Sequence, residues 1–169
     1  MAIREVLRYP DPALKQSCRP LGITEGELIA RLAEDLVETM RAHTGCVGLA
    51  APQLGELVRV VVVDVDGHPR ATSSNGLLVL ANPRLVHASG SEVAREGCLS
   101  IPELTANVKR ATEITVAASI PGSGPTTVDS TGFEARCLQH ELDHLDGILF
   151  LDRVASLTAD VFRRARPGS

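Results

Sequence analysis

Apolar residues recur every three or four positions near the start of the chain, which is the spacing of an amphipathic helix. They are Leu28, Ile29, Leu32, Leu36 and Met40. Thr24, with Glu27 three residues later, has the signature of a capping box, and Gly45 suits a helix end. The pattern predicts an N-terminal helix that begins at Thr24 and ends before Gly45, after an irregular, proline-containing arm over residues 1–20.

The middle of the chain has the short apolar runs and the alternation that are typical of β-strands. Strands or strand-like stretches are predicted over residues 58–66, 77–89, 92–104 and 110–119. We expect Pro83 to interrupt the second stretch, and Gly97 and Pro102 to bend the third. The links between these stretches are short and rich in glycine and asparagine, which favours antiparallel pairing over helical crossovers.

A second helix is predicted over residues 132–146. Thr131 and Glu134 suit another capping box, and Gly147 suits the position just after the helix. The order helix, strands, helix indicates an α+β fold, with mostly antiparallel sheets packed around the C-terminal helix and an N-terminal helix besides.

Length and charge limit the class of protein. The 169 residues predict a single domain over 1–169, large enough to bury a stable core without disulfides or a structural metal. The formal net charge of −4 argues against a broad basic face for nucleic acid. The tail over residues 162–169, FRRARPGS, is nevertheless basic. It is either a frayed terminus or a weak contact with ribosomal RNA.

The N-terminal sequence MAIREVLRYP lacks the apolar stretch of a signal peptide, and the longest apolar runs are too short to span a membrane. We therefore expect a cytoplasmic protein, monomeric and without membrane contact. Its four cysteines are then thiols or metal ligands rather than disulfides.

The second helix carries the pattern H-E-x-x-H. His140 and His144 are four residues apart, so both imidazoles lie on one face, one turn apart, and can reach one ion. Glu141 lies beside them, in the position of a base acting on a metal-bound water. The alternative is an acidic amphipathic helix that contains histidines by chance.

Two histidines need a third ligand. Cys137 lies seven residues before His144, about 10.5 Å along the helix axis, which is too far for good tetrahedral coordination. We expect Cys137 to be a buried apolar contact instead. Cys98, beside a glycine at a strand end, is modestly favoured over Cys18 and Cys46. The 25 residues that follow His144 contain no glutamate, so a His₂Glu site fits poorly.

Three further polar residues are candidates for supporting roles. Gln53, in the glycine-rich loop over residues 45–55, either caps its own backbone or acts in a site. Glu96 is expected to orient a metal ligand. Asp143 and Asp146 are expected on the solvated face of the second helix; the alternative is that one of them bonds a ligand histidine.

Three segments together resemble the motifs of peptide deformylases, in the right order and spacing. They are CVGLAAPQ (46–53), EGCLS (96–100) and QHELDHLDG (139–147). LRYPDPAL and LFLDR also resemble that family, so the resemblance covers residues 3–154. One departure is Cys46, where the family commonly has glycine.

The resemblance implies a metal-dependent hydrolase that removes the formyl group from the N-terminal formylmethionine of nascent chains and releases formate. It implies metal ligation by Cys98, His140 and His144, general acid/base catalysis by Glu141, and oxyanion stabilisation by Gln53 and the Leu99 N–H. Gly48 would offer its backbone to the extended substrate. The implied metal is Fe²⁺, with Zn²⁺ as an alternative.

An apolar pocket is needed for the substrate's methionine. Phe133 shares the metal-facing side of the helix and is a candidate wall. Arg136 would line the pocket with its aliphatic stem or meet a substrate carbonyl. Two other functions remain open: a general H-E-x-x-H metallopeptidase, and a non-catalytic metal-binding protein associated with the ribosome.

Overall fold

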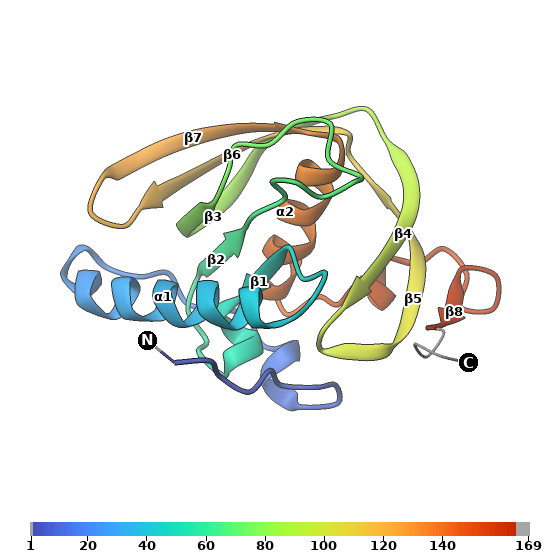
Figure 1. The fold of residues 1–169 in the computed structure, drawn as a ribbon, viewed down its shortest axis with the longest axis horizontal. Helices are drawn as coiled ribbons and strands as arrows, with labels where there is room; N and C mark the ends of the chain where they lie inside the picture. Colours follow the sequence, from blue (N-terminus) through green and yellow to red (C-terminus); the bar gives the residue numbers. More distant parts are fainter. Residues whose placement is uncertain (1, 165–169) are drawn as a thin grey trace.

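The computed structural model describes residues 2–164 as two antiparallel sheets arranged around one helix (Figure 1). The helices are α1 (Gly26–Ala42) and α2 (Gly132–Leu145), with short 3-10 helices at Pro12–Lys15, Ile23–Glu25, Ala51–Leu54 and Phe150–Arg153. The strands are β1 (Gly48–Ala50), β2 (Val60–Val63), β3 (Leu78–Ser89), β4 (Glu92–Cys98), β5 (Ile101–Arg110), β6 (Glu113–Ile120), β7 (Gly124–Thr131) and β8 (Val161–Arg163). The predicted α+β class is confirmed.

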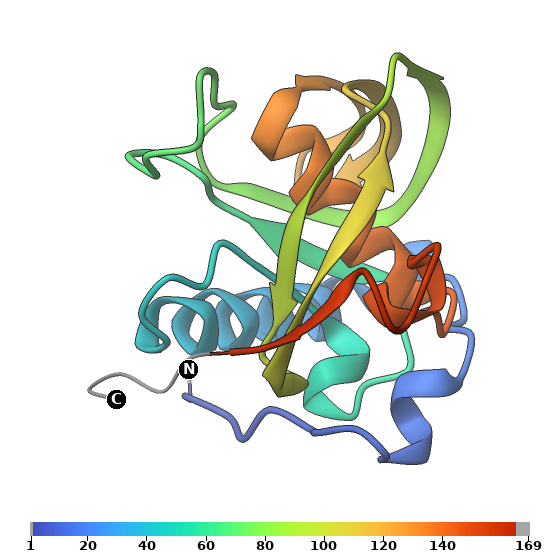
Figure 2. The same cartoon turned by 90° about the vertical axis from the view of Figure 1, so that its right-hand side faces the viewer.

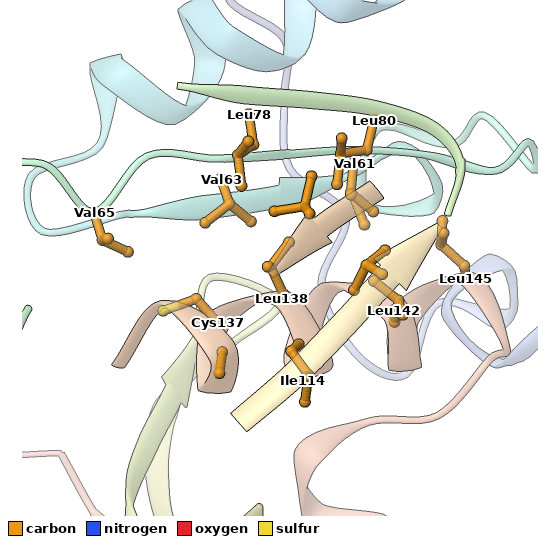
Figure 3. Close-up of a cluster of buried hydrophobic side chains, with 14 of the residues drawn as sticks. Val61, Val63, Val65, Leu78, Leu80, Ile114, Cys137, Leu138, Leu142 and Leu145 are labelled. Carbon is orange, nitrogen blue, oxygen red and sulfur yellow. The ribbon is translucent and has the colours of Figure 1, made fainter. Parts of the chain in front are cut away.

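The larger sheet has the order β1-β2-β3-β6-β7, and its strand β2 is buried on both faces. Because side chains alternate along a strand, its four valines divide between two cores. Val61 and Val63 pack with Leu138 of α2, as Figure 3 shows. Val60 and Val62 pack with the residues of α1. The run of consecutive valines is therefore explained by helices on either side of this strand.

The smaller sheet has the order β4-β5-β8 and lies on the other side of α2 (Figures 1 and 2). A tight turn at Leu99 and Ser100 joins β4 to β5, so Cys98 lies at the end of β4 beside this turn. Helix α2 is fixed to this sheet by Arg136, which donates to the carbonyl oxygens of Val108 and Glu92 at 2.8 Å each.

The N-terminal arm contacts every segment that carries a motif. Its backbone N–H groups at Leu7 and Tyr9 donate to the carbonyls of Gln53 and Ser100, at 2.8 and 2.9 Å. Further along, Cys18 donates to the carbonyl of Leu145 at 2.8 Å, at the end of α2. The arm thus ties the loop over residues 45–55, the β4–β5 turn and helix α2 together.

Both predicted capping boxes are wrong. Helix α1 begins at Gly26 after a 3-10 turn, and there Glu25 accepts from the backbone N–H of Gly22 at 2.7 Å. At α2, the Thr131 side chain makes no cap. Glu134 is buried and accepts from Ser130 Oγ at 2.6 Å and from the backbone of the loop before β3. The contact of Glu134 with the loop before β3 takes the place of the predicted capping box with Thr131.

Two further expectations need correction. Strand β3 continues through Pro83, because a register shift beside Asn82 accommodates it. Asn82 has a φ of 50° and exchanges two hydrogen bonds with the backbone of Leu21. The start of the basic tail is not frayed, since Phe162 lies in β8 opposite Thr105. Residues 165–169 of the tail lie outside the described residues. No described helix is long and apolar enough to cross a membrane.

Gly147 gives a test of the arm's packing. Its φ is 70°, and a Cβ there would lie 2.7 Å from the backbone C and O of Lys15. We expect Gly147→Ala to lose about 1–2 kcal/mol through the left-handed backbone and about 1–3 kcal/mol more through the clash. Gly122→Ala, with a φ of 76° and open space around the added carbon, should lose only the first amount. Urea unfolding of both variants measures the difference, and equal losses would contradict the packing argument.

Candidate metal centre

Helix α2 and strand β4 bring three ligand atoms together. The ligand atoms of Cys98, His140 and His144 all lie within 4.8 Å of one another, the arrangement of a metal site. Cys98 Sγ lies 3.3 Å from His144 Nε2. Cys137 is not in this group and packs in the core beside Leu138, as helix geometry predicted. Two elements far apart in sequence therefore share the site.

The charges of this cluster favour a bound cation. Burial alone would raise the pKa of the Cys98 thiol, but His144 and His140 bring that pKa well below its usual value. Burial would lower the pKa of His140, yet its contacts with Cys98 and Glu96 raise it well above the usual value. The site therefore stabilises the thiolate of Cys98 and favours a positive charge beside it. A metal ion would supply that charge in place of the proton on a histidine.

Glu96 orients the first histidine. Its Oε2 lies 2.9 Å from His140 Nδ1, as expected for a carboxylate that supports a metal ligand. The same carboxylate accepts from Arg110 at 2.9 and 3.0 Å and from Arg136 at 2.8 Å. Burial would raise the pKa of Glu96, but its contacts with His140 and Arg110 hold that pKa far below its usual value. The carboxylate therefore stays ionised.

Asp143 is not on the solvated face, contrary to expectation. It is buried and forms ion pairs with Arg110 and Arg153. Asp146 is exposed and pairs with Arg59 at 2.6 Å. Neither carboxylate bonds a candidate ligand histidine: Glu96 contacts His140 Nδ1, and His144 Nδ1 is buried without a hydrogen-bond partner among the described residues.

Glu141 lies in a buried position with spare hydrogen-bonding capacity. Its Oε2 has no hydrogen-bond partner among the described residues, although it is fully enclosed. Burial raises the pKa of Glu141 to about 7, against the lowering effect of His140 and His144. Gly48 passes so close that a Cβ there would lie 2.6 Å from Glu141 Oε1. The carboxylate is therefore confined by the backbone of β1.

Gln53 caps its own backbone, and its amide nitrogen also lies beside the candidate ligand Cys98. Its Oε1 accepts from the N–H of Ala50 at 2.9 Å, which caps the short helix Ala51–Leu54. This contact leaves the amide Nε2 pointing towards the site, where it lies 3.1 Å from Ser100 Oγ and 3.5 Å from Cys98 Sγ. Leu99, beside Cys98, lines the same cavity. The structure thus places both expected oxyanion donors next to the candidate ligands.

The cavity in front of the cluster has a volume of about 230 Å³. Phe133 lines it at the start of α2, where a wall for an apolar side chain was expected. The ring of His68 stacks on Phe133 with 4.4 Å between centroids, and the guanidinium of Arg70 lies 4.6 Å from the Phe133 ring centre. Both come from the loop after β2.

Arg136 also lines the cavity, but its guanidinium is bound inside the protein to Glu96 and Val108. It is therefore not placed to meet a substrate carbonyl, and only its stem remains for the cavity wall. Sequence reasoning missed the parts played by Ser100, Arg110 and His68. No periodicity or motif marks such residues, because the fold alone brings them to the site.

The comparisons with known proteins agree with this geometry. The chain matches the polypeptide deformylase family over residues 3–160. It is 40% identical over 164 residues to the peptide deformylase of Thermodesulfovibrio yellowstonii, covering 97% of this chain and 96% of that one. It is 41% identical over 164 residues to the peptide deformylase of Desulfotalea psychrophila, with 97% and 95% covered.

Solved structures show the same fold. A crystal structure of a peptide deformylase from Legionella pneumophila superimposes with a TM-score of 0.82 at 37% identity, covering 92% of this chain and 88% of that chain. A Met-Ala-Ser-bound class I type b peptide deformylase from Acinetobacter baumannii gives 0.84 at 32% identity, with 90% and 99% covered. Sequence and structure agree over nearly the whole length, so this chain belongs to the peptide deformylase family of hydrolases.

Proposed function

We propose that this protein hydrolyses the formyl amide of N-terminal formylmethionine on nascent polypeptides and releases formate. The observation that carries the proposal is the unpartnered Oε2 of Glu141, buried in the cavity beside Cys98 and the two histidines. A buried carboxylate oxygen without a partner is costly unless a ligand or water completes its hydrogen bonds. The Met-Ala-Ser peptide named for the Acinetobacter baumannii relative is the kind of product that this reaction would leave.

The residues present fit a divalent metal ion. Cys98, His140 and His144 would hold it, leaving a position open as in catalytic rather than structural sites. When bound, such an ion polarises a carbonyl and acidifies a water molecule. Thiolate and imidazole ligands suit both Fe²⁺ and Zn²⁺, and we propose Fe²⁺ as the resident ion, with Zn²⁺ as an alternative.

The proton path is proposed to run through Glu141. Its carboxylate would take a proton from the attacking water and give it to the amine of methionine as the C–N bond breaks. A pKa of about 7, raised by burial, suits a group that must both accept and return a proton near neutral pH. The Gln53 amide and the Leu99 N–H would stabilise the negative oxygen of the tetrahedral intermediate.

The methionine side chain is proposed to enter the cavity along Phe133 and the stem of Arg136, with Gly48 offering its backbone to the extended peptide. Because the substrate is a nascent chain, the proposed place of action is the cytoplasm. We also propose that the protein acts as a monomer. A ribosome contact through the basic tail stays a prediction.

Formate release tests the function directly. Wild type should release formate from a formyl-Met peptide without cutting its peptide bonds, and Glu141→Gln should lower kcat by about 10²–10⁴-fold at unchanged metal content. An enzymatic formate assay with mass spectrometry of the peptide, and metal analysis of both proteins, makes the measurement. Peptide-bond cleavage would favour a general metallopeptidase. Full activity of the variant would contradict the mechanism, and no turnover by either protein would favour a non-catalytic metal-binding protein.

Gln53→Ala tests the proposed oxyanion donor. We expect kcat to fall by about 10²–10³-fold, the usual effect of removing one such donor. The variant also loses the cap on Ala50, at a cost of about 1 kcal/mol, so it should remain folded. Thermal unfolding of the same preparation checks this point. A kcat within a few-fold of wild type would remove Gln53 from the mechanism.

Glu96→Gln tests the support of His140. The variant leaves the buried Arg136 without a carboxylate and leaves Arg110 with Asp143 alone, so we expect a stability loss of about 3–5 kcal/mol. The affinity for the metal should fall by about 10–100-fold, because the orientation of His140 is lost. Urea unfolding and metal retention against a chelator measure these effects. Glu92→Gln changes an exposed carboxylate on the same strand and should change neither quantity.

A further inference from the structure

Three exposed arginines border the cavity. Arg70 belongs to the loop after β2, Arg95 to β4, and Arg164 follows β8. Two acidic residues line the same cavity, Glu96 and Glu141, and both are buried. The exposed part of the cavity wall therefore carries positive charge only. We call Arg70, Arg95 and Arg164 the rim arginines.

Neutral groups hold two of these guanidinium groups in place. Arg70 Nη1 donates to the carbonyl of Arg95 at 3.1 Å, and the guanidinium lies over Phe133. Arg95 Nε donates to Asn107 Oδ1 at 3.1 Å, and its guanidinium lies 3.5 Å from the ring centre of Phe162. These contacts restrict the side chains without neutralising their charge.

Within residues 2–164, no ion pair involves a rim arginine. Arg59, Arg110 and Arg153, in contrast, each contact a carboxylate. An anchored guanidinium without a carboxylate can bind an anionic ligand. The whole chain has a net charge of −4 and would weakly repel such a ligand, so any attraction has to come from the rim.

Arg164 lies against the residue that precedes Cys98. A Cβ on Gly97 would lie 2.0 Å from Arg164 Nη2, so this guanidinium covers Gly97, the residue before Cys98. Strand β4 is at the edge of its sheet, and its exposed side chains alternate with buried ones, so Arg95 shares the outer face with Gly97. An extended peptide with its formyl group at Cys98 advances about 3.3 Å per residue. With its methionine in the cavity, the following residues of such a peptide would pass the rim arginines.

We propose that the rim arginines select formylated peptides that carry an acidic side chain at the second or third residue. This inference rests on the deformylase function proposed above and adds a substrate preference to it. A phosphate of RNA would offer the same charge, but the rim lies in the wall of the substrate cavity, which favours a carboxylate on the substrate itself.

A matched pair of substrates tests the preference. Formyl-Met-Asp-Ser and formyl-Met-Asn-Ser, both with amidated C-termini, differ only in one charge, and a second pair places Asp or Asn at the third residue. In at least one pair, kcat/KM from formate release should be about 3–10-fold higher for the Asp peptide at low ionic strength. The ratio should approach one in about 0.5 M salt, where exposed charges are screened.

Variants assign the preference to the rim. Arg164→Gln and Arg70→Gln should each lower the Asp/Asn ratio by about two-fold or more. Arg163→Gln makes the same change in net charge on a side chain that does not line the cavity, so its ratio should equal that of wild type. Both substrates are measured on one preparation, so differences in metal content or folded fraction cancel in the ratio.

A wild-type ratio of one or below in both pairs would overturn the proposal, as would an equal loss in Arg163→Gln. A ratio near one, together with inhibition by an RNA oligonucleotide that Arg164→Gln relieves, would assign the rim to RNA and overturn it too. Turnover of the Asn peptides upholds the deformylase function whatever the ratio. Turnover of none of the peptides would overturn both.

Discussion

The buried carboxylate of Glu96 joins the small sheet to helix α2, and the geometry of the candidate metal site depends on that junction. It contacts His140 on one side and the guanidinium groups of Arg110 and Arg136 on the other. Arg110 continues to Asp143, one turn along the same helix face. A buried charge is tolerated only when such partners surround it. Removing one partner leaves the opposite charge buried without compensation and destabilises the fold. The position of Cys98 relative to the two histidines is therefore fixed by electrostatics as well as by packing.

Apolar packing determines the other half of the geometry. Strand β2 is filled with valine on both faces, so it holds α1 and α2 at fixed positions on either side. Strand β1 pairs with β2 and carries Gly48 to within van der Waals contact of Glu141. Helix α2 is thus fixed on one face by a neutral core and on the other by ion pairs. Neither face alone would bring all the ligands together.

The sequence predicted those features that depend on local pattern. The two histidines on one helix face, the distance that excludes Cys137 and the α+β order all follow from spacing. Asp143 shows the limit, because its position on the helix resembles a solvated one, and only the arrival of Arg110 and Arg153 from elsewhere makes it buried. Glu134 likewise is not in its predicted capping contact, because it accepts hydrogen bonds from the backbone and side chain of Asn75, far away in the sequence. Whether a charged residue of a helix is buried or exposed cannot be predicted from its own segment when its partners lie on another segment.

The N-terminal arm has a consequence for the order in which the molecule is built. The arm is synthesised before its hydrogen-bond partners Gln53, Ser100 and Leu145. The arm stays without them until nearly the whole chain has emerged, since long-range contacts can form only when both segments exist.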